Sequence, residues 1–201
     1  MLQFLMLAFA LTVNAPDYHI TDQVKVMQAK KNVVAASTSQ ESDEENTYPN
    51  YIHIPLSNDL KKYIYEESKK YGISYELMLS IAYVESKFDT DVLSYDGSST
   101  GLYQLNRRNT VSWICEQMGV KRLDPNNPYE ATRMAVWYID YLRKKYLNEG
   151  YSEESATKRA LLAYRFGMSK SKGKSLNHAY VKAVLKYKQQ LESGEISVNH
   201  T

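Results

Sequence analysis

The segment from Ser74 to Ser86 constrains the fold of this chain more than any other. Leu77, Ile81 and Val84 recur at the three- and four-residue spacing of one helix face, and Met78 and Ala82 follow the same spacing on the adjacent side. Ser74 is a favoured N-cap residue, and Glu76 suits the positive end of a helix dipole. The segment therefore predicts a helix that is buried over most of its surface, against which the rest of the domain must pack.

Glu85 falls in the last turn of this predicted helix. The carbonyl end of a helix disfavours negative charge and partial burial disfavours it again, so both effects raise the pKa of the carboxyl group. A carboxylic acid that stays protonated near neutral pH is suited to general acid catalysis. A glutamate considered alone is more often a solvated helix end, so the hypothesis depends on the residues around it.

The periodicity of the rest of the chain is also helical. Capping residues, prolines and glycines place further helices at about 57–71, 109–119, 128–146, 152–166 and 177–193. No segment predicts a strand or a hairpin, so the predicted fold class is all-α. We expect residues 51–193 to make up the folded domain and residues 194–201 to form a C-terminal tail.

The first 50 residues differ from the domain in composition. Residues 1–15 are mostly apolar and end in the small-residue pattern Val13-Asn14-Ala15, which predicts a signal peptide or a short membrane anchor. The segment lacks an early Lys or Arg and is shorter than the about 18–20 residues of a spanning helix, so both alternatives stay open. Residues 16–50 are rich in polar residues toward their end and predict a flexible linker. Either alternative implies export.

Composition narrows the range of partners and cofactors. The 201 residues carry a formal net charge of only +2, which gives no support to nucleic-acid binding. The four histidines are scattered without the spacing of metal ligands, so we expect no metal site and no cofactor. Cys115 is the single cysteine, which excludes an intrachain disulfide, and its helical pattern predicts a buried apolar residue.

Four short motifs in this chain resemble those of a known family. Glu85-Ser86 is followed by Ser94, then by the run 101–104 (Gly-Leu-Tyr-Gln), and later by the run 163–167 (Ala-Tyr-Arg-Phe-Gly). They resemble the Glu-Ser, Ser, Gly-Leu-Met-Gln and Ala-Tyr-Asn-x-Gly motifs of the soluble lytic transglycosylase (SLT) domain, in the lysozyme-like superfamily. The resemblance covers residues 71–187. Arg165 departs from the family Asn, and the loop before Gln104 is one residue longer than the common form.

The resemblance implies a lysozyme-like lobe whose cleft lies beside Glu85. It implies a peptidoglycan lytic transglycosylase that cleaves the β-1,4 bond between N-acetylmuramic acid (MurNAc) and N-acetylglucosamine (GlcNAc) and leaves 1,6-anhydro ends. Glu85 would be the general acid and then the base. By the same resemblance, substrate-binding residues are Ser94, Tyr103, Gln104 and Tyr164, with Ser86 and Gly101 as supporting positions. We also expect the Tyr164 phenol to contact the Glu85 carboxyl group.

The biological setting follows from the same resemblance. The partners would be peptidoglycan glycan strands, and the location would be the bacterial cell envelope or the extracellular space. The N-terminal residues would give membrane tethering if they remain as an anchor. An envelope-spanning machinery, such as a secretion or conjugation apparatus, is a further compatible partner.

Two alternatives remain for the activity. A hydrolytic muramidase on the same fold needs a second carboxylate, for which Asp89, Asp91 and Asp96 are the candidates. A non-catalytic peptidoglycan-binding scaffold is supported by Arg165 and by the longer loop. The lysine-rich run 169–175 is either a solvated surface or a source of attraction to the carboxylates of peptide stems or to anionic wall polymers.

Overall fold

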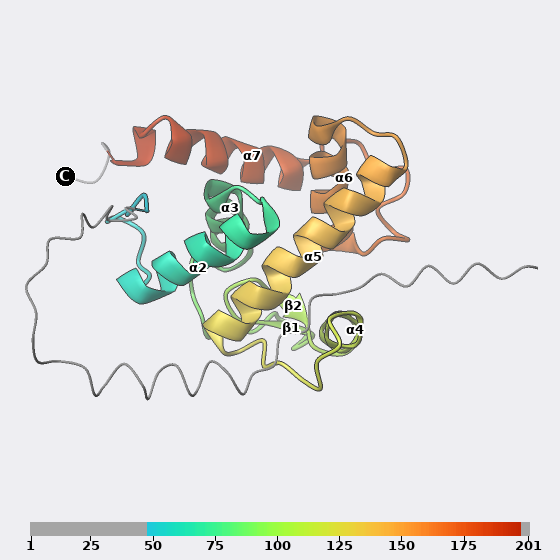
Figure 1. Cartoon of the computed structure of the whole chain (residues 1–201), viewed down its shortest axis with the longest axis horizontal. Helices are drawn as coiled ribbons and strands as arrows, with labels where there is room; N and C mark the ends of the chain where they lie inside the picture. Colours follow the sequence, from blue (N-terminus) through green and yellow to red (C-terminus); the bar gives the residue numbers. More distant parts are fainter. Residues whose placement is uncertain (1–47, 198–201) are drawn as a thin grey trace, which may run out of the picture. The chain divides into compact units, whose positions relative to one another are not determined.

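The computed structural model describes residues 48–197 of the chain. The predicted signal or anchor segment (1–15), nearly all of the predicted linker (16–50) and the last four residues lie outside the described residues. The described part contains six α-helices, a sheet of two short strands and a final 3₁₀ turn (Figure 1). The elements are α2 (Asn58–Tyr71), α3 (Tyr75–Ser86), β1 (Ser99–Thr100), β2 (Leu105–Asn106), α4 (Thr110–Gln117), α5 (Pro128–Asn148), α6 (Glu153–Phe166), α7 (Ala179–Glu192) and η1 (Glu195–Ser197).

Helix α3 lies inside the domain, as its apolar pattern predicts. The Ser74 hydroxyl accepts a hydrogen bond from the Leu77 amide at 3.2 Å and so caps the helix at its first turn. Most of α3 is buried, including Met78 and Ile81. Helix α3 packs between α2 and α7 (Figure 1). The carboxyl end of α3 is therefore held in a fixed place by helices from both ends of the described chain.

The other helices complete a single hydrophobic core. Helix α5 packs against α2 and α6, and α6 also contacts α7. Ser57 and Ser152, the first residues of two predicted helical ranges, each accept a backbone hydrogen bond from the first turn of their helix. The last helix begins at Ala179 rather than after Asn177, because the His178 ring nitrogen Nδ1 accepts from the Tyr180 amide and caps the helix. The all-α prediction is thus confirmed, with small shifts at helix ends.

The strand pair is the element that the sequence did not predict. Ser99 pairs with Asn106 and Thr100 with Leu105, in antiparallel register, and Thr100 also bridges Leu93. Two-residue strands have no periodicity to detect, which is why the pattern of the sequence could not predict them. This pair closes the loop that follows Glu85 and carries Gln104 at its turn.

Residues at the two ends of the described chain also pack onto the domain. The Tyr48 ring lies 5.9 Å from the Tyr65 ring and 6.5 Å from the Tyr75 ring, and its hydroxyl donates to the Asn58 carbonyl oxygen. Ile196 packs against the core at the other end. The folded part therefore includes residues on both sides of the predicted 51–193 boundaries. No helix within residues 48–197 has the length and apolar character that crossing a membrane requires.

Candidate active site

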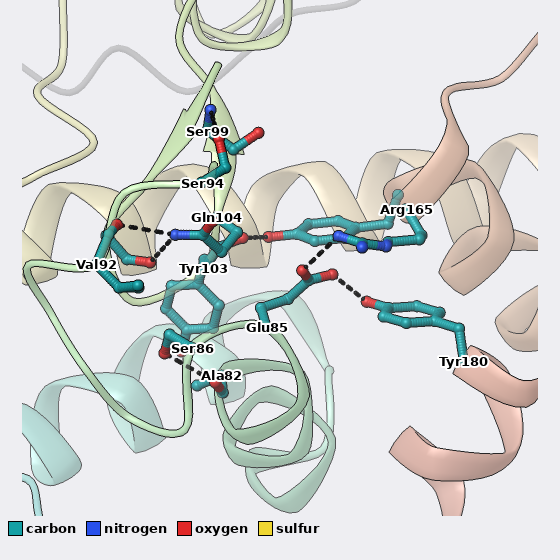
Figure 2. A network of polar contacts seen from close by, with 12 residues as sticks. Ala82, Glu85, Ser86, Val92, Ser94, Ser99, Tyr103, Gln104, Arg165 and Tyr180 are labelled. Atoms are coloured by element: carbon teal, nitrogen blue, oxygen red, sulfur yellow. Dashed lines mark hydrogen bonds and ion pairs between the residues drawn. The ribbon is translucent and has the colours of Figure 1, made fainter. Parts of the chain in front are cut away.

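Glu85 lies in the last turn of α3 with its carboxyl group almost fully enclosed. Its side chain is only 4 % exposed. Oxygen Oε1 accepts a hydrogen bond of 2.7 Å from the Tyr180 hydroxyl on α7, and Oε2 accepts one of 3.0 Å from Arg165 Nη1 on α6 (Figure 2). Both carboxyl oxygens are thus bonded to donors from the C-terminal helices.

Burial raises the pKa of the Glu85 carboxyl group above its ordinary value. The hydrogen bond from Tyr180 opposes this effect, and so do the charge and the hydrogen bond of Arg165. Burial dominates because the Arg165 side chain is 50 % exposed, where solvent screens its charge. Burial also raises the pKa of Tyr180, so this phenol stays protonated and keeps donating to Glu85.

The backbone around Glu85 is strained on both sides of the site. The non-glycine residues with positive φ in the described chain are Lys87, Phe88 and Gln104, at 57°, 69° and 46°. Two of them follow α3 directly, and Phe88 is buried, so its side chain anchors the sharp turn. Such conformations cost of order 1–3 kcal/mol each and tend to occur at functional sites. The left-handed conformations of Lys87 and Phe88 end α3 immediately after Ser86 and direct the chain into the loop.

Gln104 and Gly101 shape the loop opposite the helix end. The Gln104 amide nitrogen Nε2 donates to the carbonyl oxygens of Val92 and Gly101 at 3.0 and 3.1 Å (Figure 2). Gly101 has a φ of 74°, and a Cβ there would lie 2.3 Å from the Pro125 carbonyl oxygen. The supporting role predicted for Gly101 has this physical basis, because no side chain fits between the loop and Pro125.

Ser94 belongs to a tight turn at the tip of the same loop. Its hydroxyl donates to Asp96 Oδ1 at 2.8 Å and accepts from the Ser99 amide at 2.9 Å. Gly97 has a φ of 66°, and its amide closes the turn onto the Ser94 carbonyl oxygen, so this glycine accommodates the longer loop. The serine hydroxyls at 98 and 94 lower the pKa of Asp96 to about 2, so this carboxylate stays ionised. A substrate contact by Ser94 stays a prediction.

Tyr103 and Tyr164 occupy positions that differ from those expected. The Tyr164 hydroxyl donates to the Tyr103 carbonyl oxygen at 2.7 Å, and the expected contact between the Tyr164 phenol and the Glu85 carboxyl group stays a prediction. The phenol that donates a hydrogen bond to Glu85 is Tyr180. The Tyr103 side chain is 0 % exposed and belongs to the core, so its burial does not support the substrate contact that the sequence predicted, which stays a prediction. Tyr164 instead connects α6 to the loop, and the Glu85 charge still acts on its hydroxyl.

Ser86 has a local role. Its hydroxyl donates to the Ala82 carbonyl oxygen at 2.9 Å within α3, which satisfies a buried polar group at the helix end (Figure 2). This bond fits the supporting role that the sequence predicted for Ser86.

The sequence missed the two partners of the Glu85 carboxyl group. Arg165 lies 80 residues and Tyr180 lies 95 residues further along the chain. Signals for both were present, since Arg165 replaces the Asn of the family motif and Tyr180 opens the last helix. Helical periodicity indicates which face of a helix is buried, but not which side chain of another helix it meets. These two contacts of Glu85 therefore become visible only in the folded structure.

We place the candidate site at Glu85 because of the chemistry of its side chains and not because of a hollow in the structure. A hollow of about 860 Å³ lies between α4 and the start of α5, among residues that include Arg107, Cys115 and Glu130, and Glu85 does not line it. Within residues 48–197, no group of three or more His, Cys, Asp or Glu side chains could hold a metal ion. The enclosed carboxyl group with its two donors is the arrangement that can transfer a proton.

Comparison with known proteins agrees with this fold. The family model of the Transglycosylase SLT domain matches residues 62–185, and the chain belongs to this family. The structure is similar to the X-ray structure of an inactive mutant of the lytic transglycosylase Slt from Pseudomonas aeruginosa, with a TM-score of 0.55 and 18 % sequence identity. That match covers 73 % of this chain and only 25 % of the Pseudomonas chain, so it supports the fold alone. No curated protein is similar enough in sequence to count as a match.

Proposed function

We propose that this protein is a peptidoglycan lytic transglycosylase that cleaves the β-1,4 bond between MurNAc and GlcNAc. The observation that carries the proposal is the enclosed Glu85 carboxyl group, whose pKa is raised by burial at the end of α3. A carboxyl group with a raised pKa keeps its proton to a higher pH than an ordinary one and can deliver it to a departing sugar oxygen. Family membership makes peptidoglycan the substrate to test first.

The reaction uses Glu85 twice. The protonated carboxyl group gives its proton to the oxygen that links MurNAc to GlcNAc, and the bond from that oxygen to MurNAc C1 breaks. The resulting carboxylate then takes the proton of the MurNAc 6-hydroxyl while O6 attacks C1 and closes a 1,6-anhydro ring. Glu85 regains its proton, GlcNAc leaves with a 4-hydroxyl group, and no water is consumed.

The geometry suggests which oxygen carries the transferable proton. Tyr180 donates to Oε1, so this oxygen serves as an acceptor in both steps. Oε2 is the oxygen that bonds to Arg165, the more exposed of the two partners. We therefore assign the transferable proton to Oε2 and a positioning role to Tyr180.

The surroundings of Glu85 favour the transglycosylase over a hydrolase. Hydrolysis by the usual routes needs a second carboxylate about 5–5.5 Å or about 6.5–9.5 Å from the acid. Tyr180 and Arg165, the groups that join burial in shifting the Glu85 pKa, are not carboxylates. Asp96 serves the Ser94 turn, and Asp89 accepts from the Asp91 amide. A single carboxyl group is what intramolecular attack by O6 requires.

The same proposal includes export. Peptidoglycan lies outside the cytoplasmic membrane, so the chain must leave the cytoplasm to meet it. We propose that residues 1–15 direct this export, either as a cleaved signal or as a retained anchor.

Mass spectrometry of digested peptidoglycan tests the proposal. We expect 1,6-anhydro ends from the wild-type protein and a loss of about 100- to 10,000-fold in the Glu85→Gln variant, which keeps the shape but cannot transfer the proton. Circular dichroism of the variant controls for unfolding. Reducing ends would identify a hydrolase instead. Retention on wall-containing gels without clearing would identify a binding protein, and near-normal activity of Glu85→Gln would remove Glu85 from the site.

A further inference from the structure

Arg165 bonds to Oε2 of Glu85, the oxygen to which we assign the transferable proton. Its Nη1 donates to Glu85 Oε2 at 3.0 Å. A guanidinium group is always charged and has only donors. A proton on Oε2 would point at another N–H group, and the linking oxygen of a sugar chain needs the same position beside Oε2. The contact between Arg165 and Glu85 therefore has to open before Glu85 can donate its proton.

The two partners of Glu85 differ in how easily they can move away. Tyr180 is 9 % exposed and is fixed by the packing of α7 on α3. The Arg165 side chain is 50 % exposed, at the last turn of α6, with its guanidinium group 5.8 Å from the centre of the Tyr180 ring. Arg165 can thus swing toward solvent while Tyr180 stays in place. An anion offered in exchange favours this movement, because it replaces the charge-assisted hydrogen bond that Arg165 loses when it leaves Glu85.

The segment on either side of Arg165 in the chain is positively charged and attracts such anions. Residues 155–191 contain seven lysines, two arginines and no Asp or Glu, although the net charge of the whole chain is only +2. Lys158 and Lys188 pair with Glu154 and Glu192. The ion pairs found within residues 48–197 include none of the three lysines in the loop between α6 and α7, at positions 170, 172 and 174. This loop begins directly after the helix turn that carries Arg165.

We propose that Arg165 is a specificity-determining residue that exchanges its Glu85 partner for a carboxylate of the peptide stem on the substrate. The inference rests on the proposed function and defines its substrate more narrowly, as glycan strands whose stems carry free carboxylates. In this scheme the stem carboxylate draws the guanidinium group away and frees Oε2 to donate its proton. A strand without such carboxylates leaves Arg165 on Glu85 and is cleaved slowly.

A binding experiment tests the exchange without any turnover. The probe is one disaccharide–peptide repeat, GlcNAc–MurNAc with its stem, which contains no MurNAc–GlcNAc bond. A second probe has its stem carboxylates converted to amides. Calorimetry compares the wild-type protein with Glu85→Gln, Arg165→Gln and the double variant. We expect Glu85→Gln to bind the carboxylate probe about ten-fold more tightly, because Arg165 then has no competing carboxylate.

The controls of this experiment are specific to the exchange. The gain in affinity should be absent with the amidated probe and absent in the double variant. An unchanged affinity in Glu85→Gln, or an equal gain with both probes, would overturn the inference. If the affinities follow the expected pattern but the wild-type protein releases no anhydro ends from peptidoglycan, the proposed function is contradicted and the exchange is not.

A kinetic experiment measures the consequence for specificity. The ratio of kcat/KM on intact peptidoglycan to kcat/KM on the same polymer with amidated stems should fall about ten-fold in Arg165→Gln, with activity on the amidated polymer rising. Arg165→Lys keeps the charge and should keep most of the ratio. Lys172→Gln removes an equal charge from the neighbouring loop and should not raise activity on the amidated polymer. An unchanged ratio in Arg165→Gln, or an equal fall on both polymers, contradicts the exchange.

Discussion

The two sides of the Glu85 site are built differently. On the loop side, residues 89–106, polar groups bond mainly to one another and to the loop backbone, as Gln104 does to Val92 and Gly101. On the helix side, α6 and α7, the side chains of Arg165 and Tyr180 reach the carboxyl group itself. Figure 2 shows both sets of contacts around Glu85. We therefore expect the loop side to define the space beside Glu85 and the helix side to control its proton.

The two sides also obtain their rigidity in different ways. The loop side depends on backbone conformations that few residues adopt, at Gly97, Gly101 and Gln104. The helix side depends on ordinary packing of buried residues such as Ala163 and Val184. Substitutions on the loop side should therefore cost stability first, whereas substitutions at the acid's partners should change chemistry first.

The largest effect on the loop side is expected for Gly101→Ala. The added Cβ would lie 2.3 Å from the Pro125 carbonyl oxygen at a φ of 74°, so the backbone has to move. We expect a loss of about 2–5 kcal/mol in the free energy of unfolding, from overpacking and left-handed strain together. Thermal unfolding followed by circular dichroism measures this loss, and lytic activity should fall with it.

Gly97→Ala is the matched control for this prediction. Gly97 has a similar φ of 66°, but a Cβ there meets nothing within 4 Å. We expect it to cost about 1–2 kcal/mol, the strain alone. Equal losses in the two variants would mean that the close approach of Gly101 to Pro125 contributes nothing to the shape of the site.

The second prediction separates the two tyrosines on the helix side. Tyr180→Phe removes the hydrogen bond to Oε1, whereas Tyr164→Phe removes the bond to the Tyr103 carbonyl oxygen. We expect Tyr180→Phe to lower kcat about ten-fold, the usual value of a hydrogen bond to a charged group. Tyr164→Phe should mainly lower the unfolding temperature. Parallel measurement of kcat and thermal stability checks both.

The pH profile of Tyr180→Phe gives an independent check. The Tyr180 hydrogen bond stabilises the ionised carboxylate and so lowers the pKa of Glu85, against the larger effect of burial. Its removal should raise that pKa. The general acid must be protonated, so the decline of kcat/KM at high pH should move to higher pH in this variant. A profile that does not move, or that moves equally in Tyr164→Phe, would break the distinction between the two tyrosines.

The sequence predicted the elements of the site better than the contacts within it. Helix α3 and the place of Glu85 in its last turn followed from apolar spacing and from the Ser74 cap. The two-residue strands left no pattern, because periodicity needs more residues than they contain. We expected the Tyr164 phenol beside Glu85, whereas the phenol that donates a hydrogen bond to its carboxyl group is Tyr180. Tyr164 lies near the end of α6 and Tyr180 near the start of α7, and only tertiary packing decides which of them donates to Glu85. The burial of Tyr103 was not predicted for the same reason.

The smallest effect is expected for Ser94→Ala, at the tip of the loop side. Its hydroxyl bonds to Asp96 and to the Ser99 amide, so the variant loses two exposed or half-buried contacts. We expect a loss of about 1 kcal/mol in stability and a change in activity of no more than a few-fold, seen in KM rather than kcat. Ser98→Ala is the matched control, because its hydroxyl also donates to Asp96. If Ser94→Ala instead lowers kcat far more than Ser98→Ala at equal stability, Ser94 takes a direct part in the reaction, and the loop side does more than define the space beside Glu85.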